Sequence, residues 1–214
     1  MLSLELPSGA LRLLALGAHA DDLEIGCGGT LLRLAGEGRI AEARWVVLSG
    51  DQTRAAEAQR AASIFLERVP SCEVVTGAFR DGFFPYDGGK VKDFFEELKL
   101  DFQPDLVLTH RREDLHQDHR LVSELTWNTF RDHLILEYEV PKYDGDLRSP
   151  NLFVELSETV CRRKVAAIVE GFASQAQRSW FTEDLFWSLL RLRGVESSST
   201  TGFAEGFHCR KVAL

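Results

Sequence analysis

Two short segments rich in histidine and aspartate carry the residues most able to do chemistry in this chain. One reads His19-Ala20-Asp21-Asp22 and the other, far downstream, reads His116-Gln117-Asp118-His119. Imidazole nitrogens and carboxylate oxygens are common zinc ligands in proteins, and a carboxylate left over beside a metal can act as a base. Together the segments predict a metal site with its own acid and base.

The elements that position these segments are two predicted buried strands. The apolar run at residues 11–18 precedes the first segment, and the run at 105–109 precedes the second. Ligands bind at the carboxyl ends of parallel strands in open α/β sheets, so we expect the segments to meet there. Taken alone, each segment is also typical of polar residues that cap a helix. Their joint occurrence after two strands favours a site.

The remaining pattern alternates strands with helices. Further strands are predicted at 45–48, 72–76, 134–140, 151–156 and 203–212, and helices at 31–35, 53–66, 90–100, about 118–130, 157–172 and 180–192. Ser157 is expected to cap the helix that follows it. The glycines at 26, 28 and 29 are expected to allow a tight turn and close packing of a helix against the sheet. The pattern predicts an α/β, Rossmann-like, mostly parallel sheet flanked by helices, in a single domain over residues 1–214.

Composition narrows the class of protein. The chain has 214 residues, 25 basic and 33 acidic, and a net charge of −8, which argues against nucleic acid as a partner. No apolar stretch predicts a membrane span, and residues 1–5 lack a secretory pattern. The four cysteines form no C-x-x-C pair, so we expect reduced thiols and a cytoplasmic protein.

Several familiar motifs are absent from the sequence. There is no G-x-x-x-x-G-K-[ST] phosphate loop, and the glycines after Ile25 do not form G-x-G-x-x-G. No G-x-S-x-G nucleophile elbow occurs either. A dinucleotide cofactor and a serine-hydrolase mechanism are therefore not expected.

The sequence resembles the zinc-dependent N-acetylglucosaminylphosphatidylinositol de-N-acetylase-like deacetylases, the PIG-L or LmbE-like family. The marks of that family are an A-H-P-D-D segment and a later H-x-D-H segment, matched here by residues 18–22 and 116–119. Residues 203–207 are also similar to a C-terminal stretch of the family. Ala20 stands where the family usually has proline, which loosens the loop but removes no ligand or catalytic group.

The resemblance implies a set of metal ligands, namely His19, Asp22 and His119. Zinc is the expected metal, and two imidazoles with one carboxylate also suit iron(II) or cobalt(II). Positions left open on the metal would serve water and substrate.

The resemblance also implies catalytic roles. Asp21 would be the general base that acts on a metal-activated water. His116 would stabilise the oxyanion as an imidazolium, and Asp118 would hold His116. Either Asp21 or His116 would protonate the leaving amine, and the residues leave that choice open.

Other candidates have equally good structural interpretations. Arg54 and Arg111 are candidate substrate contacts, but Arg54 could instead form an exposed helical pair with Glu57, and Arg111 could lie in a solvated loop. His110 is interpreted as a spare histidine at a strand end. Tyr86 and Trp180 belong to aromatic clusters that suit a core or an oligomer contact, or sugar stacking.

The function implied by the resemblance is metal-dependent hydrolysis of an N-acetyl group from an N-acetylated amino sugar or its conjugate. One alternative is a hydrolase of another amide or N-acyl glycoside. Another is a non-catalytic α/β module whose metal is structural or absent. The resemblance also implies a homo-oligomer.

Overall fold

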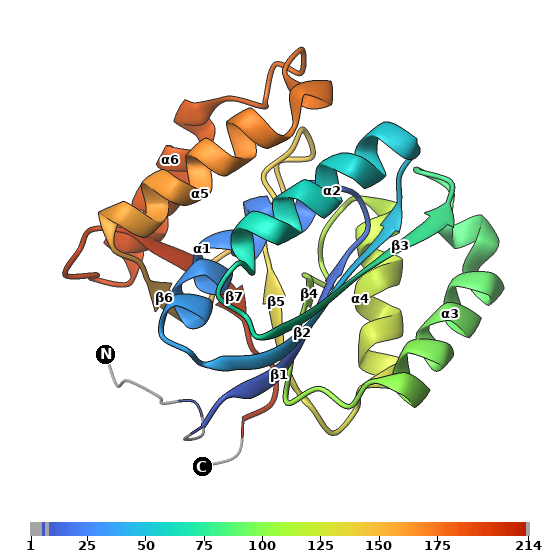
Figure 1. The fold of residues 1–214 in the computed structure, drawn as a ribbon. Coiled ribbons are helices and arrows are strands. Elements are labelled where there is room, and N and C mark those ends of the chain that lie inside the picture. The colour runs from blue at the N-terminus through green and yellow to red at the C-terminus, as the bar shows by residue number, and fades with distance from the viewer. Residues whose placement is uncertain (1–5, 7–8, 213–214) are drawn as a thin grey trace.

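The computed structural model describes residue 6 and residues 9–212 (Figure 1). Residues 1–5, where no secretory pattern was found, lie outside the described residues.

The described residues form one sheet of seven strands in the order β3-β2-β1-β4-β5-β7-β6. The strands are β1 (Leu11–Gly17), β2 (Ile40–Ser49), β3 (Ser71–Phe79), β4 (Leu106–His110), β5 (Leu134–Tyr138), β6 (Leu152–Glu155) and β7 (Ala204–His208). Strands β1 to β5 are parallel, whereas β7 is antiparallel to both β5 and β6. This topology confirms the predicted α/β fold with a mostly parallel sheet.

Helices cover both faces of this sheet. They are α1 (Asp22–Gly36), α2 (Gln52–Phe65), α3 (Gly88–Asp101), α4 (Gln117–Thr129), α5 (Glu158–Gly171) and α6 (Glu183–Glu196), with 3₁₀ turns η1 (Phe84–Asp87) and η2 (Ala173–Gln175). Helices α3 and α4 pack together on one face, and α1, α2, α5 and α6 lie on the other (Figure 1). Each face has its own apolar core.

The central strands are buried on both faces. In β1, Leu13 and Ala15 enter one core, while Leu14 and Leu16 enter the other. This arrangement explains why the strand reads as a nearly continuous apolar run rather than an alternating one. It also holds the carboxyl end of β1 rigidly in the middle of the sheet.

Helix α1 begins earlier than the sequence predicts. It starts at Asp22 rather than at residue 31, and the three glycines expected to form a turn lie inside it. The predicted turn is wrong, whereas the expected close packing of the helix against the sheet is confirmed. A Cβ at Gly26 would lie 2.1 Å from the Tyr138 ring, and one at Gly28 would lie 2.5 Å from the Phe65 ring.

Other local predictions are met. The Ser157 hydroxyl accepts a hydrogen bond from the Val160 amide at 3.3 Å and so caps α5, as expected. All four cysteines are free thiols.

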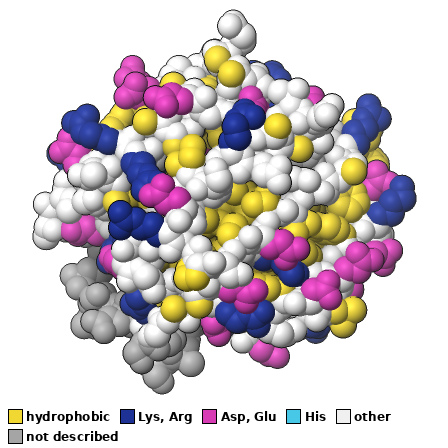
Figure 2. All heavy atoms as spheres, in the orientation of Figure 1, with side chains coloured by type: hydrophobic (Ala, Val, Ile, Leu, Met, Phe, Trp, Pro, Cys, Tyr) yellow, Lys and Arg dark blue, Asp and Glu magenta, His cyan; other side chains and the backbone are white. Residues whose placement is uncertain are grey.

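Within residues 9–212, the helices are too short or too polar to cross a membrane. Acidic and basic side chains are interspersed over the face shown in Figure 2, with apolar groups exposed between them.

Candidate active site

Both polar segments lie at the carboxyl edge of the sheet, where the strand order changes direction. The chain fills β2 and β3 on one side of β1, and β4 and β5 on the other, so β1 and β4 are neighbours at the switch point. His19 and Asp21 follow β1, while His116 and His119 lie at the start of α4, after β4. The two segments therefore meet in the crevice where open α/β sheets bind ligands.

The donor atoms of the three expected metal ligands converge. His19 Nδ1 lies 3.2 Å from His119 Nε2 and 3.4 Å from Asp22 Oδ2, and His119 Nε2 lies 3.4 Å from Asp22 Oδ1. Donor atoms about 2.1 Å from a tetrahedral zinc lie about 3.4 Å from one another. The spacing of this donor set therefore fits a small tetrahedral metal ion.

His119 is oriented by a buried carboxylate that the sequence did not single out. Its Nδ1 lies 3.1 Å from Asp114 Oδ2, and the Lys142 ammonium lies 2.9 Å from the other Asp114 oxygen. Burial lowers the pKa of His119 to about 4, with a further lowering from His110. A neutral imidazole whose Nδ1–H is held by a carboxylate presents Nε2 as the metal-binding atom.

His110 was interpreted as a spare histidine, but it lies within the cluster. Its Nε2 is 3.2 Å from Asp22 Oδ2, and its ring stacks on His119 with the centroids 3.8 Å apart. The same nitrogen accepts a hydrogen bond from the Ala18 amide at 2.9 Å. The sequence offers one indication of this place, because His110 ends the strand that lies next to β1.

The carboxylate of Asp118 contacts His19 rather than His116. The buried carboxylate lies 3.2 Å from His19 Nε2 and accepts hydrogen bonds from the backbone amides of Gly82 at 2.6 Å and Phe84 at 3.1 Å. Asp81, which lies outside both polar segments, is 3.1 Å from the same His19 nitrogen. The loop after β3 therefore contributes to the site.

Carboxylates determine the charge of His19. Burial lowers the pKa of its ring, but hydrogen bonding to Asp118, Asp22 and Asp81 outweighs burial and raises the pKa well above its usual value.

His116 stands at the open side of the cluster. It is half-buried, with its ring centroid 4.9 Å from that of His19 and 4.6 Å from that of His119. Its Nδ1 accepts a hydrogen bond from the Asp118 amide at 3.3 Å, which caps α4. Burial and the nearby His19 lower the pKa of His116. This direction favours a neutral imidazole, where the resemblance implies an imidazolium.

Asp21 directly precedes Asp22, one of the expected metal ligands, and has a strained backbone conformation. Its φ of 101° is in the left-handed region, and only 5% of the residue is exposed. Burial raises the pKa of Asp21 to about 7, although the Arg54 guanidinium, 3.3 Å away, opposes this rise. A carboxylate that titrates near neutral pH can take up and release a proton.

The two candidate substrate arginines have partners within the chain. Arg54 also donates to the Ala20 carbonyl, so it stays beside the site and does not pair with Glu57. Glu57 is buried and instead accepts hydrogen bonds from Ser174. Arg111 is buried and contacts Asp146, rather than lying in a solvated loop.

Comparison with protein families identifies the chain. The model of the PIG-L family, described as GlcNAc-PI de-N-acetylase, matches residues 14–130, which is more than half of the chain and includes both polar segments. The chain belongs to the PIG-L family. The resemblance seen in the sequence is therefore confirmed. A search of curated proteins finds no match.

Solved structures share the PIG-L fold seen here. A conserved protein from Thermus thermophilus superposes with a TM-score of 0.76 at 21% identity, covering 95% of this chain and 96% of that one. The N,N′-diacetylchitobiose deacetylase of Pyrococcus horikoshii gives a TM-score of 0.73 at 20% identity, covering 93% and 83%. The 4-carboxy-2-hydroxymuconate hydratase GalB of Pseudomonas putida gives 0.75 at 19% identity, covering 95% and 97%. These likenesses establish the fold.

Proposed function

We propose that this protein is a metal-dependent hydrolase that removes an N-acetyl group from an N-acetylated amino sugar or its conjugate. The observation that carries the proposal is the convergence of His19, Asp22 and His119. The buried carboxylate of Asp21 is close enough to interact electrostatically with Asp22 and His19. A purely structural metal site needs no such base. Membership of a family described as GlcNAc-PI de-N-acetylase supports this reaction class.

Three protein ligands suit a catalytic rather than a structural metal. Structural zinc sites are closed by four protein ligands, whereas catalytic sites keep a position open. A zinc ion held by His19, Asp22 and His119 would supply Lewis acidity and a water with a pKa of about 7. Iron(II) or cobalt(II) could fill the same N/O donor set.

The residues around the ligands would handle the proton. Asp21 would accept the proton of the attacking water, and Arg54 would hold its carboxylate in place. His116, at the open side of the cluster, would donate a hydrogen bond to the oxyanion as the carbonyl carbon becomes tetrahedral. Cleavage of the amide C–N bond then yields acetate and a free amine, protonated by Asp21 or His116.

Release of amine and acetate tests this proposal. The protein is loaded with zinc, cobalt(II) or iron(II) and incubated with a panel of N-acetylated amino sugars, their glycosides and their lipid conjugates. We expect stoichiometric release of primary amine and acetate from at least one substrate. The matched control is Asp21→Asn, which should bind the metal as wild type does and lose most turnover.

The same experiment distinguishes the alternatives. A metal-loaded protein that cleaves only longer N-acyl chains or non-sugar amides would favour a different amide hydrolase. Bound metal without release of any amine across the panel would favour a non-catalytic module. Full activity of Asp21→Asn with metal bound would refute the assignment of Asp21 as the base.

A further inference from the structure

The middle of helix α1 packs closely against neighbouring elements of the fold, because it carries three glycines. Glycine is unfavourable inside a helix relative to alanine, yet Gly26, Gly28 and Gly29 lie close together within α1. A Cβ at Gly29 would lie 2.8 Å from Glu205 Oε1 and 2.4 Å from Leu156 Cδ1. The glycines therefore let a carboxylate from β7 reach the helix backbone.

A buried ion pair between Lys164 and Glu205 binds the acceptor and the donor of one backbone hydrogen-bond position in the helix. In an α-helix the Ile25 carbonyl is the acceptor for the Gly29 amide. Here Lys164 Nζ donates to the Ile25 carbonyl at 2.6 Å, and the Gly29 amide donates to Glu205 Oε1 at 2.7 Å. Lys164 Nζ and Glu205 Oε1 are themselves 2.6 Å apart. The ion pair thus bridges one turn of α1.

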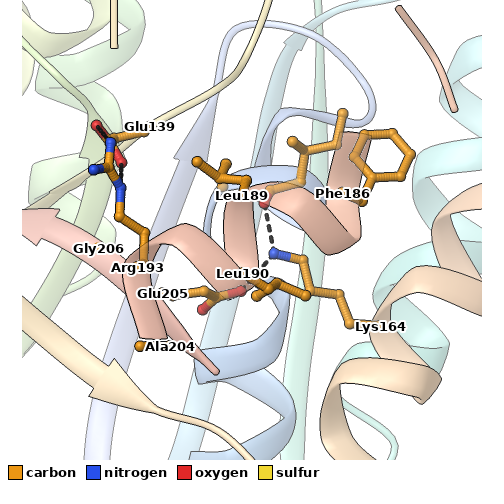
Figure 3. A pocket seen from close by; sticks show the side chains of 11 residues that line it. Glu139, Lys164, Phe186, Leu189, Leu190, Arg193, Ala204, Glu205 and Gly206 are labelled. Carbon is orange, nitrogen blue, oxygen red and sulfur yellow. Dashed lines mark hydrogen bonds and ion pairs between the residues drawn. The ribbon is translucent and has the colours of Figure 1, made fainter. Parts of the chain in front are cut away.

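Both residues of this ion pair are buried and make further hydrogen bonds within the chain. Lys164 is 3% exposed and Glu205 is 4% exposed. Glu205 also accepts hydrogen bonds from the Thr30 amide at 2.7 Å and the Thr30 hydroxyl at 2.6 Å. Figure 3 shows the pair at one side of a cavity of about 10 Å³. Because burying two charges offsets much of their attraction, a role in positioning accounts better for the pair than stability does.

The bridged turn leads directly to the site. The Ile25 amide donates to the Asp21 carbonyl at 2.9 Å, so Lys164, Ile25 and Asp21 form one line of hydrogen bonds along the helix. Asp21 is also held at a φ of 101°, a conformation that persists only when its surroundings enforce it. Asp22, the next residue, is a predicted metal ligand.

We propose that the buried Lys164–Glu205 ion pair is a positioning device that sets the first turn of α1, and with it the metal-binding carboxylate of Asp22 and the base Asp21. Both residues of the pair come from the C-terminal part of the chain, beyond residues 14–130 matched by the family model. The inference rests on the metal site of the proposed function, but not on the identity of the substrate.

Metal affinity after loss of the Glu205 charge tests this inference. Zinc and cobalt(II) dissociation constants are measured by chelator competition for wild type and Glu205→Gln. We expect Glu205→Gln to bind both metals about 10- to 100-fold more weakly, as when an outer-shell partner of a metal ligand is removed. The visible absorption spectrum of the cobalt(II) protein should also change, because it reports the geometry of the ligands.

A second buried ion pair provides the matched control. Arg193 and Glu139 lie at the other side of the same cavity, joined by two contacts of 2.9 Å (Figure 3). Glu139→Gln breaks an equally buried pair whose hydrogen bonds do not reach α1. It should lower thermal stability as Glu205→Gln does, and leave the cobalt(II) spectrum and metal affinity within about twofold of wild type.

A milder variant decides the matter if Glu205→Gln does not fold. Thr30→Val removes only the hydroxyl that donates to Glu205, and should weaken metal binding severalfold. Unchanged metal affinity in the folded variant, or equal losses in Glu205→Gln and Glu139→Gln, would overturn the inference. Wild-type protein that binds metal but hydrolyses no acetamide would refute the proposed function and leave these affinity comparisons valid.

Discussion

The surroundings of the neighbouring residues Asp21 and Asp22 shift the pKa values of their carboxyl groups in opposite directions. Burial raises the pKa of Asp21 to about 7. Burial alone would also raise the pKa of Asp22, but His119 and His110 outweigh it and hold that pKa well below the usual value. Adjacent carboxylates whose surroundings separate their pKa values commonly divide into a permanent anion and a proton carrier. This division agrees with Asp22 as ligand and Asp21 as base.

The pKa of Asp21 predicts how activity depends on pH. A base works only when deprotonated, so kcat/KM should fall about tenfold per pH unit below a pH of about 7. Arg54→Met removes a charge that lowers this pKa and should move the acid limb to higher pH. A pH–rate profile measures both effects, with Arg60→Met on the same helix as control. An acid limb that stays in place in Arg54→Met would contradict the assignment.

The ligand set predicts the metal content of the protein. Wild type purified without added metal or chelator should carry close to one metal ion per chain by elemental analysis. His119→Ala removes one of three protein ligands and should lose more than nine-tenths of that metal. His133→Ala, a histidine outside both polar segments, is the control and should retain it. Equal metal in all three proteins would place the metal elsewhere.

At the scale of elements, α1 determines how closely the layers approach. Gly26, Gly28 and Gly29 face β5, α2 and β7, where the structure leaves no space for a side chain. Glycine destabilises a helix relative to alanine. The packing that these glycines allow must therefore stabilise the fold by more than this loss. The first turn of α1 carries the site, so this packing also determines where Asp21 and Asp22 lie.

Two glycines of the same helix should respond to alanine in opposite ways. A Cβ at Gly28 meets the Phe65 ring at 2.5 Å, so Gly28→Ala should lower the free energy of unfolding by about 1–3 kcal/mol. A Cβ at Gly36 meets nothing within 4 Å, so Gly36→Ala should raise it by about 0.4–1 kcal/mol. Urea denaturation measures both changes. The same sign for both variants would contradict the packing argument.

At the scale of the whole molecule, the site joins segments that are distant in the chain. The proposed metal-ligand set links the start of α1 with the start of α4, on opposite faces of the sheet. A metal bound there would bind the native state and not the unfolded chain, and would therefore stabilise the entire fold.

The temperature of thermal unfolding should report how much a bound metal stabilises the fold. Zinc at a thousand times its dissociation constant should stabilise the protein by about 4 kcal/mol, which corresponds to about 8–16 °C in Tm for a chain of this size. The comparison is between zinc-loaded and chelator-treated protein in a thermal scan. His119→Ala should show less than a quarter of this shift, and a full shift in that variant would indicate binding at another site.

Local sequence was enough to predict the kind of fold and to point to the side chains that gather at the candidate site. The histidines and aspartates at 19–22 and 116–119 indicated a metal site, and the apolar runs at 11–18 and 105–109 predicted the strands that precede them. These features are local, because hydrophobic period depends only on neighbouring residues. The early start of α1 was missed because its glycines oppose helix formation locally and are favoured only by tertiary packing.

Only the tertiary structure decided which side chains complete the site and hold it. His110, Asp114 and Lys142 join it from three different segments, and the carboxylate of Asp118 contacts His19, while its backbone amide binds His116. Glu205 reaches the Thr30 amide across 175 positions of the chain. Such contacts depend on how the crossovers return to the sheet, which no short stretch of sequence encodes. The sequence by itself therefore determined the reactive groups and their strands, and packing determined their partners, orientations and charges.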